Sequence, residues 1–443
     1  MKKLFTILLA MLVLLSALTA CGASKTPATT DSTAPKATTP VTAAAPETLS
    51  GDITMWTGSW NEGLMEELMV GFNAIYPDIH VSFEYLAWDG MEDKMLTAMM
   101  AGSGADVVDM AIAWNIPYAS AGCLVNLDDY IASNGIDLND YYPDALDTAK
   151  KDGHCYGLPY RTENTALFLN EKIFVECGIV DENGNAKAPK TWKELIETSQ
   201  TIYEKTNGQV YGFGMVGSNT GNMMSQLCSL FFSNGVSILN EDMTAAAFNT
   251  EAGIEAFETW CSMYTDYEGV APTSTLENDN TSCRTLFAAE KVAMFTSSAY
   301  DIDAILAENP DIQMRYALMP GMTEENYPGI TLLGGWNVGI SRNSKNPDAA
   351  FALISYLTSA DVSVDFSNTF SARISAAENE KYADERFTVF KEALNYGKAL
   401  PGSSHQNEIT EILYNEAQAV LTGSKDAATA LADAEAEINN VLS

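Results

Sequence analysis

The sequence predicts an α/β fold that is divided into two lobes. From residue 52 onward, segments with strand and helix patterns alternate, which is typical of a parallel sheet with helices on both faces. The roughly 394 residues that follow position 49 exceed what one hydrophobic core usually holds, so two lobes are expected. The chain is 47% hydrophobic and 19% charged, a composition typical of globular proteins.

Five elements open the first lobe. The hydrophobic pattern predicts strand, helix, strand, helix and strand over residues 52–56, 61–76, 81–86, 89–102 and 106–111. The first helix carries an apolar face at Leu64, Leu68, Phe72 and Ile75. The second carries methionines four residues apart, at Met91, Met95 and Met99. We expect the methionine stripe to pack in the core, where this side chain commonly fills irregular gaps.

The first 21 residues predict export. Two lysines precede an apolar run over residues 4–18, which is too short to span a membrane stably, and small residues precede Cys21. This arrangement resembles the lipobox of bacterial lipoproteins, in which the cysteine becomes the lipid-modified N-terminus. The resemblance implies a signal peptide over residues 1–20, a lipidated Cys21 and a position on the outer face of the cell membrane. An ordinary secretory signal with an incidental cysteine is the alternative.

Residues 21–49 follow as a linker. After Cys21 they are almost all alanine, threonine, proline and serine, so they cannot bury enough apolar surface to become ordered. The composition predicts a flexible tether between a membrane anchor and a folded body. No later apolar run reaches the roughly 18 residues that a transmembrane helix needs, so none is expected.

Charge and residue usage argue against several partners and cofactors. The formal net charge of −35 disfavours binding to nucleic acid or to anionic lipid surfaces. Separately, we expect a monomer. Six cysteines follow Cys21 without any CxxC pair, which predicts free, mostly buried thiols. The three histidines belong to no HExxH motif or Cys/His cluster, so neither a zinc site nor another cofactor is expected.

Tryptophans follow the predicted strands of the first lobe. Trp56 and Trp60 lie at the end of the first strand, and Trp114 lies after the third. Because ligands collect beyond the carboxyl ends of parallel strands, we expect these rings at one edge of the sheet. Sugars stack their C–H faces on such rings, and burying one face contributes roughly 1 to 2 kcal/mol by area. The alternative for each ring is that it closes the end of the core.

A series of short motifs along the body is specific in its order. The motifs occupy residues 72–81 (FNAIYPDIHV), 105–108 (ADVV), 118–122 (YASAG), 157–160 (GLPY), 169–172 (LNEK), 189–192 (PKTW), 290–294 (EKVAM), 334–340 (GGWNVGI) and 344–347 (SKNP). In this order they resemble the extracellular solute-binding proteins of ABC sugar importers, the family that includes maltose-binding protein. One departure is Ala105, where the family usually has proline, and it bears only on a local turn.

The resemblance implies a periplasmic-binding-protein-like, or venus-flytrap, fold in which the chain crosses between the lobes more than once. We expect lobe 1 over residues 50–161 and 322–360, and lobe 2 over residues 162–321 and 361–443. The expected crossings lie near residues 161–165, 318–321 and 357–370.

The resemblance also implies ligand contacts, position by position. The segment after the third strand supplies polar or aromatic contacts in the family, and here it holds Asp109 and Trp114. Glu163 matches an acid near the hinge, and Arg161 lies close enough to assist it. The full expected ligand-binding set is Trp56, Trp60, Asp109, Trp114, Arg161, Glu163, Ser298, Tyr300, Trp336 and Arg373. We interpret Trp192, at a helix start, as structural.

Three motifs compete with this interpretation. Residues 212–217 match GxGxxG but lie within a predicted strand and lack the acidic residue expected about twenty positions later. Residues 181–185 begin like a calcium loop, but Ala186 and Trp192 occupy its sixth and twelfth positions, so we interpret this segment as a turn. Paired acids such as Asp128 and Asp129 suit a glycosidase, yet such pairs arise by chance among 59 acidic residues.

The leading hypothesis is a lipid-anchored receptor without enzymatic activity. It captures a sugar, in our interpretation an oligosaccharide, and delivers this carbohydrate ligand to the transmembrane subunits of an ABC permease. Two alternatives stay open. One is an exported carbohydrate-active enzyme that uses acids such as Glu163, and the other is the same receptor with a peptide, polyamine or polyol phosphate as its ligand.

Overall fold

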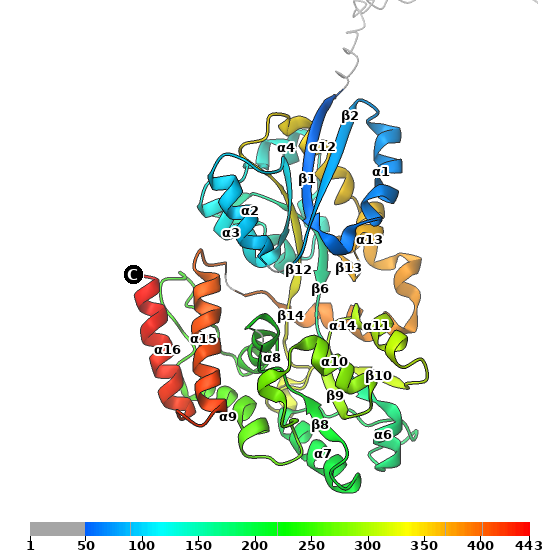
Figure 1. The fold of residues 1–443 in the computed structure, drawn as a ribbon, viewed down its shortest axis with the longest axis vertical. Coiled ribbons are helices and arrows are strands. Elements are labelled where there is room, and N and C mark those ends of the chain that lie inside the picture. Colours follow the sequence, from blue (N-terminus) through cyan, green and yellow to red (C-terminus); the bar gives the residue numbers. More distant parts are fainter. Residues whose placement is uncertain (1–48, 89, 219, 368, 401) are drawn as a thin grey trace, which may run out of the picture. The chain divides into compact units, whose positions relative to one another are not determined.

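Two separate sheets organise the described part of the chain. The computed structural model describes residues 49–88, 90–218, 220–367, 369–400 and 402–443, all of which belong to one compact unit. The predicted signal peptide, the predicted lipidation site Cys21 and nearly all of the predicted linker lie outside the described residues. Each sheet has its own covering helices, which agrees with the α/β fold of two lobes expected from the sequence (Figure 1).

The first sheet contains six strands in the order β13-β6-β12-β3-β1-β2. Their bounds are Gly51–Gly58 for β1, Ile79–Leu86 for β2, Val107–Ala111 for β3, Leu158–Glu163 for β6, Gly334–Ile340 for β12 and Phe370–Ser371 for β13. Strand β1 pairs in parallel with β2 and β3, as predicted, whereas β12 runs antiparallel to both β3 and β6. The sheet is therefore mixed, because β12 enters it from a distant part of the chain.

Helices cover both faces of this sheet. In Figure 1, α2 and α3 lie on one side of it, and α1 and α13 lie on the other. The helices near it are α1 (Leu64–Ile75), α2 (Met91–Met100), α3 (Ile112–Ser120), α4 (Asp128–Ser133), α5 (Pro143–Asp147), α12 (Pro347–Leu357) and α13 (Ala360–Phe366). A small hairpin joins β4 (Lys150–Lys151) to β5 (His154–Cys155).

The predicted apolar faces are confirmed in α2 and only partly in α1. Met91, Met95 and Met99 are buried, as expected of core residues. In α1, however, Ile75 is 59% exposed, and the expectation that it packs inward is wrong. The buried stripe of α1 includes Met65 and Met69, which lie one turn apart and place Ile75 at the margin of the apolar face.

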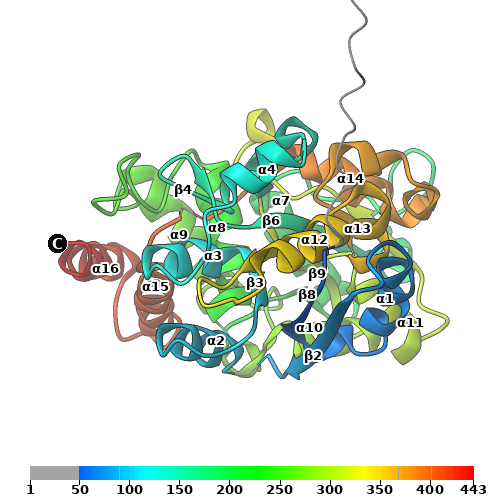
Figure 2. The ribbon, with the colours of Figure 1, turned by 90° about the horizontal axis from the view of Figure 1, so that it is seen from above.

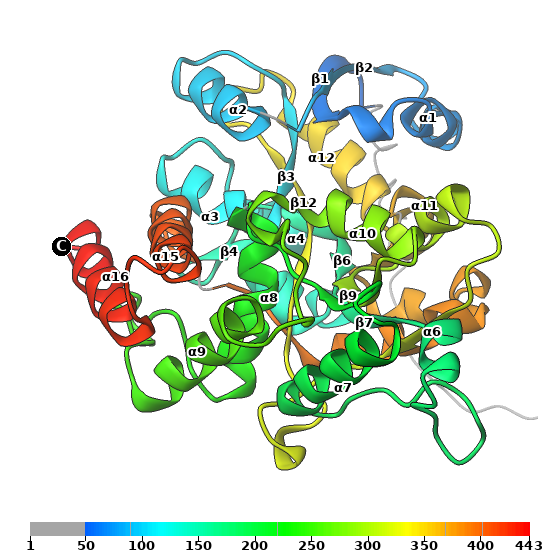
Figure 3. The ribbon, with the colours of Figure 1, turned by 60° about the horizontal axis from the view of Figure 1, so that its bottom comes forward.

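The second sheet contains four strands in the order β10-β7-β9-β8. Their bounds are Ala166–Asn170 for β7, Tyr211–Gly214 for β8, Val292–Ser297 for β9 and Met314–Ala317 for β10. Its helices are α6 (Glu171–Glu176), α7 (Trp192–Lys205), α8 (Thr220–Ser233), α9 (Glu251–Thr265), α10 (Asn280–Ala288), α11 (Asp301–Glu308) and α14 (Thr388–Ala393). The last helices, α15 (Gln406–Leu421) and α16 (Ala427–Val441), pack on each other and against α9 (Figures 2 and 3).

The chain passes between the sheets three times. Strand β6 leads directly into β7, the chain returns through β11 (Thr331–Leu332) into β12, and it leaves the first sheet again after β13. Strand β11 pairs with β14 (Gly397–Lys398), and the Thr165 and Thr331 hydroxyl groups lie 2.7 Å apart. The predicted lobe ranges stay a prediction. They differ from the sheets at β13, which pairs with β6 although the range 361–443 assigns it to the second lobe.

Two segments whose sequences resemble ligand-binding loops, residues 212–217 and 181–185, have structural roles instead. A side-chain carbon on Gly212 would lie 1.9 Å from Ser199 of α7, so this glycine lets a helix approach the strand. The backbone N–H groups of Asn183 and Asn185 donate to the Asp181 carboxylate at 2.9 and 3.0 Å, which closes a turn. Trp192 is fully buried beside Phe213, as expected of a structural residue.

The six cysteines after Cys21 are free and buried, as predicted. Burial raises the pKa of the Cys283 thiol to about 12 and also raises the pKa values of Cys228 and Cys261. We therefore expect protein that begins after Cys21 to react with the thiol reagent DTNB only slowly when native and fully in denaturant. Fast reaction of the native protein would contradict the burial of these thiols.

The helices in the described part of the chain were compared with the length and apolar composition that a membrane-spanning helix needs. No single helix there is long and apolar enough to cross a bilayer. One pair, α12 with α13, meets the length and composition criteria together but is bent by 79°.

Candidate functional site

A large cavity lies between the two sheets and is lined by residues from the strands, helices and loops around each of them. Its volume is about 970 Å³, near the upper end of the range for small-molecule sites. Trp60 and Trp336 line it from the first sheet, and Thr281 and Tyr300 line it from helices and loops of the second. A smaller cavity of about 180 Å³ shares Glu163, Tyr300 and Gly334 with it and is otherwise lined mainly by polar side chains. We call these the large and the small cavity.

Four tryptophans form one aromatic cluster at the large cavity. The ring centroid of Trp336 lies 5.1 Å from that of Trp60, 6.0 Å from that of Trp88 and 5.7 Å from that of Trp114. Trp88 also stacks on Trp114 at 5.4 Å. Trp60 and Trp88 are 40% and 54% exposed, whereas Trp114 and Trp336 are buried. We call these four residues the tryptophan cluster.

The sheet topology explains how the tryptophan cluster forms. Trp60 follows β1, Trp88 follows β2 and Trp114 lies in the first turn of α3, directly after β3. Because β1, β2 and β3 are parallel, their carboxyl ends meet at one edge of the sheet. Trp336 joins them from β12, whose pairing with β6 shifts register directly after this residue. Such bulges redirect side chains and are frequent beside binding sites.

Trp56 is a predicted aromatic residue that lies away from the cavity. It lies within β1 rather than after it, is buried, and has the ammonium group of Lys94 from α2 5.2 Å from its ring centroid. Its place is therefore in the packing between the first sheet and α2. Trp114 does not line the cavity itself but supports Trp88 from behind.

Arg161 and Glu163 form an ion pair in the wall of the large cavity. They are separated by one residue in β6, so both side chains project from the same face of the strand. Burial lowers the pKa of the Arg161 guanidinium, but Glu163, Tyr160 and Tyr300 together raise it more, so the net shift is upward. The guanidinium therefore stays charged at neutral pH. Arg161 Nε has no hydrogen-bond partner among the described residues, which leaves one donor of a charged group available.

Two glycines of β12 make room for this ion pair. A side-chain carbon on Gly334 would lie 2.7 Å from Cγ of Glu163, and one on Gly335 would lie 2.4 Å from the backbone oxygen of Arg161. Gly335 also has a φ of 146°, which L side chains rarely adopt. The two glycines before Trp336 thus allow β12 to lie close against β6.

Asp109 lies behind the cavity wall rather than in it. Its Oδ2 atom accepts hydrogen bonds from the hydroxyl of Thr57 at 2.6 Å and from Asn61 Nδ2 at 3.3 Å, and the Tyr160 hydroxyl lies 3.4 Å away. Complete burial raises the pKa of this carboxyl to about 7, against the lowering effects of the hydrogen bonds with Thr57 and Tyr160 and of the Arg161 charge. The sequence suggested a ligand contact, whereas the structure makes Asp109 a support for the turn that carries Trp60.

Ser298 and Tyr300 lie together after β9 on the second sheet. Ser298 lines the small cavity, and Tyr300 lines both cavities, so this predicted pair reaches the site. Burial raises the pKa of the Tyr300 phenol, which is therefore a neutral hydrogen-bonding group. Tyr300 and the tryptophan cluster belong to different sheets, as a site between two lobes requires.

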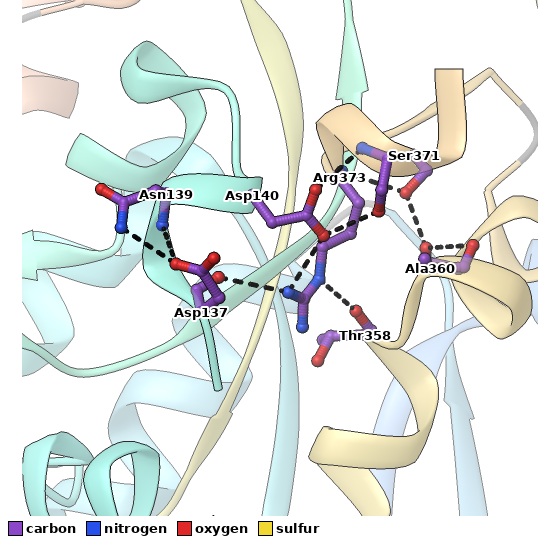
Figure 4. A network of polar contacts seen from close by, with 9 residues as sticks. Asp137, Asn139, Asp140, Thr358, Ala360, Ser371 and Arg373 are labelled. Atoms are coloured by element: carbon purple, nitrogen blue, oxygen red, sulfur yellow. Dashed lines mark hydrogen bonds and ion pairs between the residues drawn. The ribbon is translucent and has the colours of Figure 1, made fainter. Parts of the chain in front are cut away.

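Arg373 is engaged in a separate polar network (Figure 4). Its Nε donates to the backbone oxygen of Thr358 at 2.9 Å, its Nη1 lies 3.4 Å from the carboxylate of Asp140, and its guanidinium lies 4.0 Å from the ring centroid of Tyr141. It lines neither cavity. These contacts join the end of α12 to the segment before α5, so Arg373 connects elements of the first lobe.

Some residues of the cavity wall were missed in the sequence. Trp88 was recognisable in principle, because it follows β2 as Trp60 follows β1. Asp144 and Asp147 of α5, and Lys398, Leu400 and Gln406 near the start of α15, carry no local signal. Within the described residues, no group of three or more His, Cys, Asp or Glu side chains is placed to hold a metal ion.

Comparison with known proteins places this chain among solute-binding proteins. The model of the bacterial extracellular solute-binding protein family matches residues 56–363. A binding protein of Brucella abortus is 26% identical over 386 residues, covering 85% of this chain and 89% of its own. The diacetylchitobiose binding protein DasA of Streptomyces coelicolor is 26% identical and covers 67% of each chain.

A solved structure shows the same fold. An ABC transporter solute-binding protein of Thermotoga lettingae, bound with α-D-tagatose, superimposes with a TM-score of 0.77 at 26% identity. The match covers 89% of this chain and all of that one. The two-lobe venus-flytrap fold expected from the sequence is thereby confirmed.

Proposed function

The chain belongs to the bacterial extracellular solute-binding protein family, and from this premise we propose that it captures an oligosaccharide for an ABC importer. The ligand would bind in the large cavity and then pass to the transmembrane subunits of the permease. The tryptophan cluster is the observation that carries this proposal. Two of its rings are exposed at the cavity, and rings of this kind offer apolar faces to the C–H groups of sugars.

Polar groups around the cluster support a carbohydrate ligand. Arg161, Glu163 and Tyr300 line the same cavity, so charged and neutral hydrogen-bonding groups face an aromatic wall. A sugar combines apolar faces with rings of hydroxyl groups, and this wall complements both. The volume of about 970 Å³ is large for a single sugar ring, which supports a ligand of several units.

The N-terminal residues support an anchored location. The arrangement of residues 2–21 suits cleavage before Cys21 and lipidation of its thiol. We propose that the protein is tethered in this way to the outer face of the cell membrane. Mass spectrometry of the protein from membranes tests this, because a lipidated Cys21 gives a diagnostic N-terminal peptide that a Cys21→Ser variant lacks.

The cavity is built for binding rather than for glycoside hydrolysis. Hydrolysis needs one carboxyl group that can donate a proton and a second carboxylate across the sugar. Glu163 is already engaged in an ion pair with the buried guanidinium of Arg161, a contact that suits a fixed binding group. Among the known relatives, the named ones are binding proteins as well.

A ligand screen tests the proposal. Thermal unfolding of the purified protein would be followed with maltotriose, N,N′-diacetylchitobiose, lactose, a tripeptide, spermidine and a polyol phosphate. A ligand that binds only the folded state adds about 2.7 kcal/mol at one hundred times its dissociation constant, which gives a clear shift. We expect a shift with an oligosaccharide and none with the other classes.

Two results would contradict the proposal. A shift with only peptide, polyamine or polyol phosphate would keep the receptor and overturn the sugar assignment. Chromatography of the incubated oligosaccharides should show no cleavage, and cleavage products that disappear in a Glu163→Gln variant would make the protein an enzyme.

A further inference from the structure

Gln406 is a buried side chain without internal partners at the wall of the large cavity. It is the first residue of α15, is only 3% exposed and lines the cavity. Neither Oε1 nor Nε2 of its carboxamide has a hydrogen-bond partner among the described residues. Because an unsatisfied buried polar group is costly, such groups in native proteins usually meet water or a ligand.

Two other glutamines of the same region, the buried Gln226 and the half-buried Gln418, have hydrogen-bond partners. Gln226 accepts from the backbone N–H of Val216 at 3.1 Å, and its Nε2 donates to the backbone oxygen of Gly214 at 3.1 Å. Gln418, three turns further along α15, donates to the backbone oxygen of Gly217. The unpartnered amide of Gln406 is therefore a local property of the cavity wall and not a general feature of this helix.

The segment that carries Gln406 is fixed against helices of the first lobe. The neighbouring Asn407 donates from Nδ2 to the carboxylate of Glu92 in α2 at 2.8 Å. Gly402 fits against Ile116 of α3, since a side-chain carbon there would lie 2.0 Å from Cδ1 of Ile116. The backbone N–H of Gln406 donates to the backbone oxygen of Ser403 at 3.3 Å. The carboxamide is thus held at the wall in advance of binding.

We propose that Gln406 is a specificity-determining residue that binds two neighbouring hydroxyl groups of one sugar unit. A carboxamide presents an acceptor and a donor side by side. A vicinal diol matches both, because one hydroxyl donates to Oε1 while the oxygen of the next accepts from Nε2. A carboxylate ligand would satisfy only Nε2, and an ammonium ligand only Oε1. This inference rests on the proposed function and deepens it.

The test compares two glutamines of the same helix by isothermal titration calorimetry. The probe is whichever of maltotriose, N,N′-diacetylchitobiose and lactose stabilises the wild-type protein. We expect Gln406→Leu to weaken binding about tenfold or more, the ratio expected from two lost neutral hydrogen bonds, without lowering the melting temperature. Gln418→Leu, the matched control, should lower the melting temperature and leave the dissociation constant unchanged. Gln406→Glu, which keeps only acceptors, is the second variant if the leucine variant does not fold.

Monodeoxy derivatives of the probe identify the hydroxyl pair. In the wild-type protein, removal of either of two adjacent hydroxyls should weaken binding, whereas in Gln406→Leu the same removals should have little effect. If Gln406→Leu binds the sugar as tightly as the wild type, the amide meets only water and the inference is overturned while the proposed function stands. If no sugar binds the wild-type protein, the proposed function itself fails.

Discussion

Replacing Trp336 by alanine is expected to lower the free energy of unfolding by about 3 to 5 kcal/mol and to remove most of the sugar affinity. The side chain is only 6% exposed, and its ring lies against all three other members of the tryptophan cluster. Its removal opens a cavity and also withdraws the support of Trp60 and Trp88. Urea unfolding gives the stability, and calorimetry with the stabilising sugar gives the affinity.

The control for Trp336 is a second buried tryptophan that is remote from the site. Trp260 lies in α9 and lines neither cavity, so Trp260→Ala should cost a similar amount of stability and leave the affinity of the folded protein unchanged. Unchanged affinity in Trp336→Ala would show that the large cavity is not the binding site.

The second large effect concerns the dependence of stability on pH. Burial raises the pKa of Asp109 to about 7, well above the value of about 3.9 in an unfolded chain. Between these values the native state holds a proton that the unfolded state has lost, so this group makes stability fall as pH rises from about 4 to 7. Asparagine cannot ionise and has nearly the same shape. Asp109→Asn should therefore match the wild type near pH 4 and exceed its stability at pH 8 by a few kcal/mol, on the order of 1.36 per pKa unit.

A carboxylate with the opposite shift serves as the control. The backbone N–H of Cys155 donates to Asp128 at 2.9 Å, His154 also contacts this carboxylate, and despite partial desolvation these bonds lower its pKa. Asp128→Asn should thus lose stability near neutral pH, and the loss should shrink as pH falls below about 4. Chemical unfolding of both variants from about pH 2 to 8 gives the comparison. Parallel pH profiles for Asp109→Asn and the wild type would mean that Asp109 is already ionised in the native protein.

The sequence was most informative where a strand ends. Alternating strand and helix patterns are local, so β1, β2 and β3 and the order of the helices between them could be predicted with small errors at their ends. Parallel pairing then places Trp60 and Trp114 at one edge without any further information. The antiparallel β12 could not be derived from periodicity, because it reaches the sheet from a segment more than two hundred residues away.

The direction of a side chain was harder to predict than its position. Trp56 and Asp109 stand beside the correct strand ends, yet both point into protein, since neighbouring residues of a strand face opposite sides of the sheet. Arg373 lies near the passage between sheets but is taken up by the Asp140 carboxylate and the Thr358 backbone. Gln406 reaches the cavity because the start of α15 lies against helices of the first lobe. No local sequence pattern predicts this long-range contact.

The tryptophan cluster also gives the protein an optical signal of its own. The chain has seven tryptophans, and four of them lie with ring centroids 5.1 to 6.2 Å from a neighbour in the cluster. At such separations the electronic transitions of indole rings couple, so circular dichroism in the far ultraviolet reports their mutual orientation. Any occupant that turns Trp60 or Trp88 changes this coupling, and the state of the site can be followed without a label.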